Sequence, residues 1–216
     1  MTTETLNISE AQLVEYSQAH NEPSWLTDLR KEALKLTETL EMPRPDKTKI
    51  KRWDFDSFQQ LETTGGAYET LEEFPDSIKR IIDVDRSENL VIQHNNSTAF
   101  TRLSESAKND GVIVEGLAEA LVNHPDLVKK YLMTEAVNVD EHRITALHTA
   151  LINGGLFVYV PKNVVVEHPI QYVVLHDDEK ASFFNHVIIA TEESAEVTYV
   201  ENYLSCLLYT SPSPRD

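Results

Sequence analysis

The sequence predicts an α+β fold, in which a helical N-terminal region precedes a region of closely spaced strands. Near the N-terminus, apolar residues recur every three or four positions, as they do on one face of a helix. From Leu156 onward, five short apolar runs follow one another within about fifty residues, with no helical pattern between them. Such a succession of strands suits a β-sandwich, a barrel or a stacked β-solenoid, and periodicity alone does not choose among them.

Two helices are expected in the N-terminal region. The first begins after Ser9, because Gln12 three residues later completes the spacing of a capping box. The second begins near Pro23 and ends before Pro43, since proline starts helices well but cannot continue them. Its apolar stripe is expected to consist of Trp25, Leu29, Ala33, Leu36 and Leu40.

The middle of the chain is expected to mix strands and helices. Residues 88–95 and 111–117 are rich in β-branched residues and predict short strands. Residues 117–133 predict a helix with a break before Pro125, and residues 139–153 predict another. This last helix is expected to carry acidic residues in its first turn and to end at glycines, namely Asp140, Glu141, Gly154 and Gly155.

The strand-rich region is expected to contain five strands. They are residues 156–160, 164–167, 170–176, 182–191 and 195–203. Two of the runs, Val164–Val166 and Val187–Ile189, are apolar at consecutive positions. Because strands covered on both faces lose the alternation of apolar and polar residues, these two are expected to be buried on both sides.

Charge and composition narrow the range of functions. The chain has 36 acidic and 19 basic side chains, a formal net charge of −17. Such a surface repels phosphate backbones and anionic lipid, so neither nucleic acid nor a membrane is expected as a partner. The first residues lack an apolar signal-peptide core and the longest apolar runs are too short to span a bilayer, which predicts a soluble cytoplasmic protein. The basic run at residues 47–52 is interpreted as a solvated linker rather than an anion site.

The sequence predicts no catalytic, cofactor-binding or metal-binding residues. His142 and His148 are six positions apart, hence on different faces of a helix, whereas a zinc-binding helix needs a spacing of four. His168, His176 and His186 are scattered without a His-x-His pair. No G-x-S-x-G nucleophile motif and no phosphate-binding P-loop occurs in the sequence.

The last residues, 206–216, are expected to be non-native. Their sequence, CLLYTSPSPRD, translates codon for codon a DNA string that resembles a widely used transposon-type sequencing adapter. Cys206, the single cysteine, therefore receives no functional role, and the native protein is expected to continue beyond Ser205.

The stretch GGLFVYVPKNVVVEHPIQYVV, residues 154–174, resembles the SufB/SufD family of iron–sulfur cluster assembly scaffold proteins. The residues that carry the pattern are Phe157, Tyr159, Val160, Pro161, Lys162, Val164, Val166, Pro169 and Gln171. Residues 21–55 and 183–203 are similar to the family as well. The Pro-rich stretch after the second helix, and the lack of cysteine before residue 206, favour the SufD branch over the SufB branch.

The resemblance implies a helical N-terminal region followed by the start of a right-handed parallel β-helix, truncated because family members are considerably longer. In these terms, residues 1–85 are the helical N-terminal region and 86–153 a mixed α/β connecting region. Residues 154–205 are the first coils of the β-helix, and 206–216 are the adapter-derived tail.

The resemblance also implies a non-catalytic function. A SufD-like chain pairs with a SufB-like scaffold subunit and with a SufC-like ABC-type ATPase, and the complete complex, rather than this chain, handles the iron–sulfur cluster. The residues of the family that contact the ATPase or the cluster cannot be assigned to positions here. A SufB paralogue is the nearest alternative, and a β-helix or cupin-like enzyme is the alternative from another class.

Overall fold

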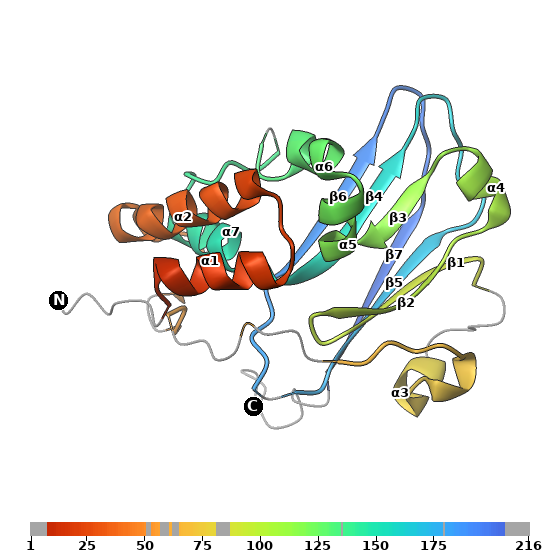
Figure 1. The fold of residues 1–216 in the computed structure, drawn as a ribbon, viewed down its shortest axis with the longest axis horizontal. Coiled ribbons are helices and arrows are strands. Elements are labelled where there is room, and N and C mark those ends of the chain that lie inside the picture. The colour runs from red at the N-terminus through yellow and green to blue at the C-terminus, as the bar shows by residue number, and fades with distance from the viewer. Residues whose placement is uncertain are drawn as a thin grey trace. The chain divides into compact units, whose positions relative to one another are not determined.

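The computed structural model describes residues 8–50, 53–56, 61, 65–80, 87–134, 136–178 and 180–205. Contacts divide the chain into two compact units, each made of two segments (Figure 1). The first unit comprises Met1–Glu62 with Ala118–Asn153, and the second comprises Thr63–Leu117 with Gly154–Asp216. The four regions expected from the sequence are consecutive stretches of the chain, whereas each of these units combines two separate stretches. The boundaries of those four regions stay a prediction.

The first unit is helical. Its helices are α1 (Glu10–Ala19), α2 (Ser24–Thr39), α5 (Leu117–Asn123), α6 (Pro125–Tyr131) and α7 (Arg143–Leu151). The capping box expected before α1 is confirmed: the Gln12 backbone N–H donates to the Ser9 hydroxyl at 3.3 Å, and the Ser9 backbone N–H donates to the Gln12 amide oxygen at 2.8 Å. The break before Pro125 is also confirmed, because this residue occupies the first turn of α6.

The buried face of α2 differs from the apolar stripe expected from the sequence. The fully buried residues are Leu26, Arg30, Ala33 and Thr37, so only Ala33 of the expected stripe is among them. The pattern failed because it counted apolar residues only. An arginine can be buried when its charge is paired and its nitrogens are hydrogen-bonded, and Arg30 meets that condition, as described below.

Helix α7 starts later than expected. It begins at Arg143, after His142, whose ring Nδ1 accepts a hydrogen bond from the Thr145 backbone N–H at 3.1 Å. Asp140 and Glu141 therefore precede the helix, and the expectation that they occupy its first turn is wrong. A ring nitrogen of histidine caps the helix in place of the carboxylates that the sequence suggested.

The second unit contains two sheets. One has the strand order β2-β1-β5-β7 and the other the order β3-β4-β6. The strands are β1 (Asn89–His94), β2 (Ser97–Arg102), β3 (Ile113–Gly116), β4 (Gly154–Val160), β5 (Ile170–His176), β6 (Asn185–Thr191) and β7 (Tyr199–Ser205). Three short elements lie in this unit as well, namely η2 (Leu71–Glu73), α3 (Asp76–Lys79) and α4 (Glu105–Asn109).

The two sheets share one hydrophobic core, and the segment around α3 packs on the outer face of the four-stranded sheet. Residues of both sheets, among them Val91, Val114, Leu156 and Tyr172, form a single buried cluster. On the other side of the four-stranded sheet, Phe74 and Ile78 of the segment around α3 are buried against a second cluster from β1, β2 and β5. The central strands β1 and β5 of the four-stranded sheet are therefore covered on both faces.

The later strands stack in parallel. Gly154 of β4 pairs with Asn185 of β6, and Ile170 of β5 pairs with Tyr199 of β7, so the chain returns to the same place after about 30 residues. Strand β1 also pairs in parallel with β5, whereas β1–β2 and β3–β4 are antiparallel. Among the described residues the strands form open sheets and no closed barrel.

Four of the five strands expected after Leu156 are confirmed, and one is not. Residues 164–167 form only an isolated bridge between Val165 and Glu196, because they turn directly after Pro161 and the Val164 N–H donates to its carbonyl at 3.2 Å. The expected burial on both faces is wrong as well, since Val165 is 59% exposed and Ile189 is 40% exposed. Strand β2 was not expected at all.

The glycine pair has a different role from the helix end expected for it. Gly154 and Gly155 open strand β4, and Gly155 has a φ of +141°. A Cβ on Gly155 would lie 1.9 Å from the carbonyl oxygen of His186 on the paired strand β6. Glycine is therefore needed for close approach of the two backbones and not for ending α7.

Candidate functional site

The family-signature residues at 157–162 belong to the fold's core and its turns. Phe157 and Val160 are fully buried in β4. The hydroxyl of Tyr159 donates to the Glu192 carboxylate at 3.5 Å, and Lys162 forms an ion pair with Glu193. These contacts hold the turn after β4 against the turn after β6. A backbone hydrogen bond from the Asn163 N–H to the Glu193 carbonyl, at 3.0 Å, joins the same two turns.

The remaining signature residues lie around the start of β5. The Gln171 side chain donates to the Ser87 hydroxyl at 2.8 Å, and Pro169 is exposed immediately before the strand. Pro161 ends β4, and its carbonyl accepts the Val164 N–H at 3.2 Å. The described contacts of these residues are those of strands and turns, and their status as a family signature stays a prediction.

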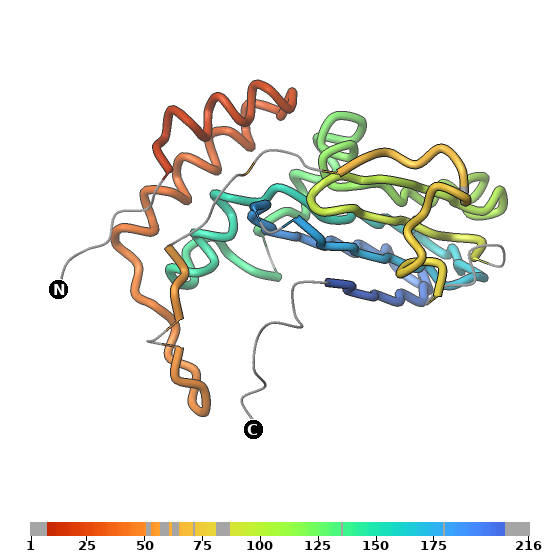
Figure 2. The backbone as a smooth tube through the Cα atoms, turned by 90° about the horizontal axis from the view of Figure 1, so that it is seen from below, coloured from red at the N-terminus to blue at the C-terminus, as the bar shows by residue number. Residues whose placement is uncertain are grey.

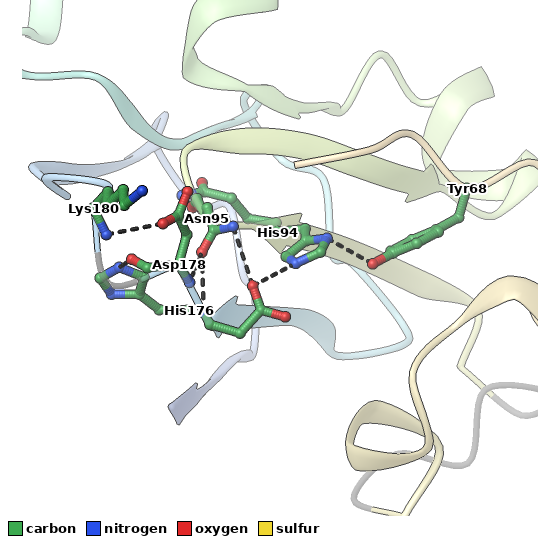
Figure 3. Close-up of polar contacts among 8 residues, drawn as sticks. Tyr68, His94, Asn95, His176, Asp178 and Lys180 are labelled. Carbon is green, nitrogen blue, oxygen red and sulfur yellow. Dashed lines mark hydrogen bonds and ion pairs between the residues drawn. The ribbon is translucent and has the colours of Figure 1, made fainter. Parts of the chain in front are cut away.

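A dense polar cluster lies where the parallel strands β1 and β5 end (Figure 3). Asn95 organises it from a left-handed backbone conformation, with a φ of 53°. Its amide oxygen accepts the backbone N–H groups of Asp177 at 3.0 Å and Asp178 at 3.3 Å, and its own N–H donates to the Leu175 carbonyl at 2.7 Å. One asparagine therefore fixes the loop that follows β5, as its short side chain commonly does in turns.

A chain of hydrogen bonds runs through His94 in this cluster. The Tyr68 hydroxyl lies 2.7 Å from Nδ1 of His94, and Nε2 of the same ring lies 2.8 Å from a carboxylate oxygen of Asp177. Burial, and then the charge of Asp177, raise the pKa of Tyr68. Phenol, imidazole and carboxylate are the parts of a proton relay, but the two partners use opposite ring nitrogens, so a single metal ion cannot bind all three.

A second polar network lies inside the second unit. Gln93 is 1% exposed, and its amide oxygen accepts the Gly155 N–H at 3.0 Å and contacts the Tyr172 hydroxyl. The same hydroxyl lies 3.1 Å from the amide oxygen of Asn185, whose nitrogen donates to the Tyr203 hydroxyl at 2.7 Å. Burial raises the pKa of Tyr172 far above its usual range and that of Tyr203 to about 12, so both hydroxyls remain neutral.

The histidines do not converge. His142 caps α7, His168 is exposed with its carbonyl accepting a hydrogen bond from Asn89, and His176 contacts the Asp178 carbonyl at 3.1 Å. Burial lowers the pKa of His186. In the described part of the chain, no three His, Cys, Asp or Glu side chains are placed to hold a metal ion. Cys206 lies outside the described residues.

A shallow hollow of about 490 Å³ lies between the end of β2 and β3. It is lined by Phe100, Thr101, Arg102, Leu103, Lys108, Val112, Ile113, Val114 and Glu115. Tyr68, His94 and Asp177 are not among the lining residues, so the relay and the hollow do not combine into one site. Within the ranges that the structure describes, no helix is both long and apolar enough to cross a membrane.

Comparison with known proteins identifies the family. The family model described as SufBD protein N-terminal region matches residues 15–172. The iron–sulfur cluster assembly protein SufD of Bacillus subtilis (strain 168) is 44% identical over 201 residues, which are 93% of this chain and 46% of that protein. Iron–sulfur cluster assembly SufBD family proteins of Staphylococcus aureus strains USA300 and NCTC 8325 are 28% identical over 206 residues, 91% of this chain and 44% of theirs.

The chain spans about half the length of the curated relatives it matches. The family resemblance expected from three separate sequence stretches is confirmed, because the family model and the Bacillus relative both extend over most of the chain. The chain therefore belongs to the SufBD family, and within that family it is like SufD.

Proposed function

We propose that this chain acts as a SufD-like, non-catalytic subunit of a complex that assembles iron–sulfur clusters. The observation that carries the proposal is 44% identity over 93% of the chain to a protein named iron–sulfur cluster assembly protein SufD. A SufB paralogue of the same complex is the alternative within the family. The comparisons give no support to the enzyme alternative, and the hydrogen-bonded group of Tyr68, His94 and Asp177 does not line the hollow between β2 and β3.

The partners follow from the same proposal. They are a SufB-like scaffold subunit and a SufC-like ABC-type ATPase in the cytoplasm. The iron–sulfur cluster is what the whole complex builds, and we propose that this chain contributes structure and binds no cofactor of its own.

We also propose that the strands of the second unit are the first coils of a right-handed parallel β-helix. The parallel pairs β4–β6 and β5–β7 support this, because each returns after about 30 residues, as the coils of a β-solenoid do. The turns stack in the same way: the Glu192 N–H donates to the Val160 carbonyl at 3.0 Å, and the Glu196 N–H donates to the Val164 carbonyl at 2.9 Å.

A chimera tests the proposed function. Residues 1–205 of this chain replace the matching part of Bacillus subtilis SufD, which supplies the other half of the protein. We expect the chimera to restore growth and iron–sulfur enzyme activity in cells depleted of SufD, and to co-purify with SufB and SufC. A chimera that accumulates in soluble form but restores neither would refute the proposal.

A further inference from the structure

The hollow between β2 and β3 lies where the edges of two different sheets meet. Strand β2 is the outermost strand of the four-stranded sheet, and β3 is the outermost strand of the three-stranded sheet. The chain passes from β2 through α4 into β3, and Figure 2 shows these elements in yellow-green and green. All of the lining residues belong to the second unit. The volume of about 490 Å³ falls within the roughly 300–1,000 Å³ that is typical of small-molecule sites.

The apolar part of the lining is held by the core of the second unit. Val112 and Val114 are buried in the cluster that the two sheets share, and Leu103 packs against that cluster. Phe100 packs against the second cluster, on the other face of the four-stranded sheet. The apolar surface that a ligand would contact is therefore fixed by the fold, as it is in small-molecule sites that are largely formed before the ligand binds.

Arg102 is held in position beside this apolar surface. Its guanidinium carbon lies 5.5 Å from the centroid of the Phe100 ring, and its Nη1 donates to the Ser87 carbonyl at 3.3 Å. A guanidinium is planar and carries several N–H donors, which suits it to bind anionic groups through paired hydrogen bonds. Because the ring and the carbonyl already restrict this side chain, less conformational entropy is lost when it binds a ligand.

Lys108 supplies a second cation from α4. Its Nζ lies 2.7 Å from a carboxylate oxygen of Glu105, and the two side chains are 53% and 82% exposed. An ion pair that is so exposed contributes little to stability, because water screens it. The ammonium group can therefore exchange the Glu105 carboxylate for an anionic group in the hollow at small cost.

The charges of the lining favour a ligand with one negative charge. Arg102 and Lys108 are cationic and Glu115 is anionic, so the lining has one positive charge in excess. A polyanion is disfavoured because the whole chain carries a formal net charge of −17. At physiological ionic strength, charges more than about 8 Å away are largely screened, so the two nearby cations dominate the interaction with a monoanion.

We propose that the hollow binds a small organic acid. Its apolar body lies on Phe100 and Leu103, and its anionic group lies between Arg102 and Lys108. The ligand joins the edges of the two sheets and α4, so its binding stabilises this part of the second unit. It is an effector rather than a cofactor of a reaction, and the site does not depend on the proposed function.

The test measures binding of anilinonaphthalene sulfonate, a monoanion whose fluorescence rises in apolar surroundings, to the full-length chimera. We expect saturable binding with a Kd below about 100 µM. Lys108→Glu and Arg102→Gln should each weaken binding at least about fivefold, because each removes a cation from the site. Lys35→Glu is the matched control, since it makes the same change of charge at a lysine that is 69% exposed on α2, and it should leave the Kd unchanged.

Phenylnaphthylamine, which has the same rings without the sulfonate, separates charge from shape. It should bind the chimera and the Lys108→Glu variant equally. A Kd for anilinonaphthalene sulfonate that Lys108→Glu leaves unchanged, or the absence of saturable binding below about 1 mM, would overturn the proposal. Because Lys108 is exposed, its substitution should leave the fold intact, so the test stands even if Arg102→Gln destabilises the unit.

Hydrogen–deuterium exchange locates the bound probe. Residues 100–115 should exchange at least about twofold more slowly with the probe than without it, whereas α2 should be unaffected. Protection confined to other parts of the chimera would show that the probe binds elsewhere, and the proposed site would be wrong. The proposed function is measured separately, by growth and co-purification, so its failure and the failure of this site are distinguishable.

Discussion

Replacing Arg30 with methionine should strongly destabilise the first unit. The Arg30 side chain is 2% exposed and the Glu22 side chain is 7% exposed. Two guanidinium nitrogens of Arg30 bind the Glu22 carboxylate at 2.8 and 2.6 Å. The guanidinium also donates to the carbonyl of Ala150, in the last turn of α7, at 2.9 Å and to that of Ile152, just after the helix, at 2.7 Å. Arg30 thus joins α2 to Glu22, just before its start, and to the end of α7, about 120 positions later in the sequence.

The size of the effect follows from what the substitution leaves behind. Arg30→Met leaves a buried carboxylate without a counter-charge, which costs about 3–5 kcal/mol. The two carbonyls lose their donors as well, and these losses overlap with the first and do not simply add. Since domains are stable by about 5–15 kcal/mol, the variant should lose a large share of its stability. With a urea dependence of about 2–3 kcal/mol per molar, the unfolding midpoint should fall by about 1.5 M.

Urea unfolding at low protein concentration, followed by tryptophan fluorescence, measures this loss, because both tryptophans belong to the first unit. Arg30→Met combined with Glu22→Leu should recover at least about 1 kcal/mol, since the stranded charge is gone. Arg44→Met is the control: its ion pair with Glu41 is 80% exposed on both sides and should contribute under about 0.5 kcal/mol. A loss below about 1 kcal/mol for Arg30→Met, or a double variant no more stable than the single one, would contradict the reasoning.

Three further substitutions test the second unit. Gly155→Ala should cost about 2–4 kcal/mol in urea unfolding, because its Cβ would meet the His186 carbonyl oxygen, whereas Gly66→Ala, with open space around it, should be nearly neutral. Tyr68→Phe removes the hydroxyl that contacts His94 and should cost about 1 kcal/mol; an unchanged unfolding midpoint would show that this bond is not stabilising. Strand β7 lies at the edge of its sheet and Val200 on it is 41% exposed, so the chain should self-associate through this strand. Light scattering should detect the self-association, and Val200→Lys should reduce it. An unsubstituted chain that stays monomeric at all concentrations would refute this prediction.

Local signals in the sequence predicted the elements they act on directly. The capping box at Ser9 fixed the start of α1, and Pro125 fixed the break before α6, because each acts within one helical turn. The sequence analysis did not predict strand β2. Asn95 and Asn96, which stand between β1 and β2, could have indicated a hairpin turn, because asparagine tolerates turn conformations. Its strand pattern is weak, since only Ala99 of its six residues is buried.

The features that sequence reasoning missed depend on contacts between distant residues. Arg30 is buried because carbonyls some 120 positions later accept its hydrogen bonds, which no periodicity can indicate. The polar cluster at the ends of β1 and β5 joins Tyr68, His94 and Asp177 in the same way. The parallel pairing of β1 with β5 brings His94 and Asp177 together, and the backbone hydrogen bond from the Tyr68 N–H to the Ala99 carbonyl at 2.8 Å holds Tyr68 beside β2. All of these contacts join residues that are too far apart in the sequence for a local pattern to reveal them.

The stretch around residues 157–171, from which the family was predicted, differs in kind from a catalytic motif. Phe157 and Val160 fill the core, and Lys162 joins one turn to the next through Glu193. Packing and turn contacts are tied to the fold rather than to a reaction, so this stretch does not locate where the protein works. Residues that act on partners need to be exposed, whereas Phe157 and Val160 are completely buried.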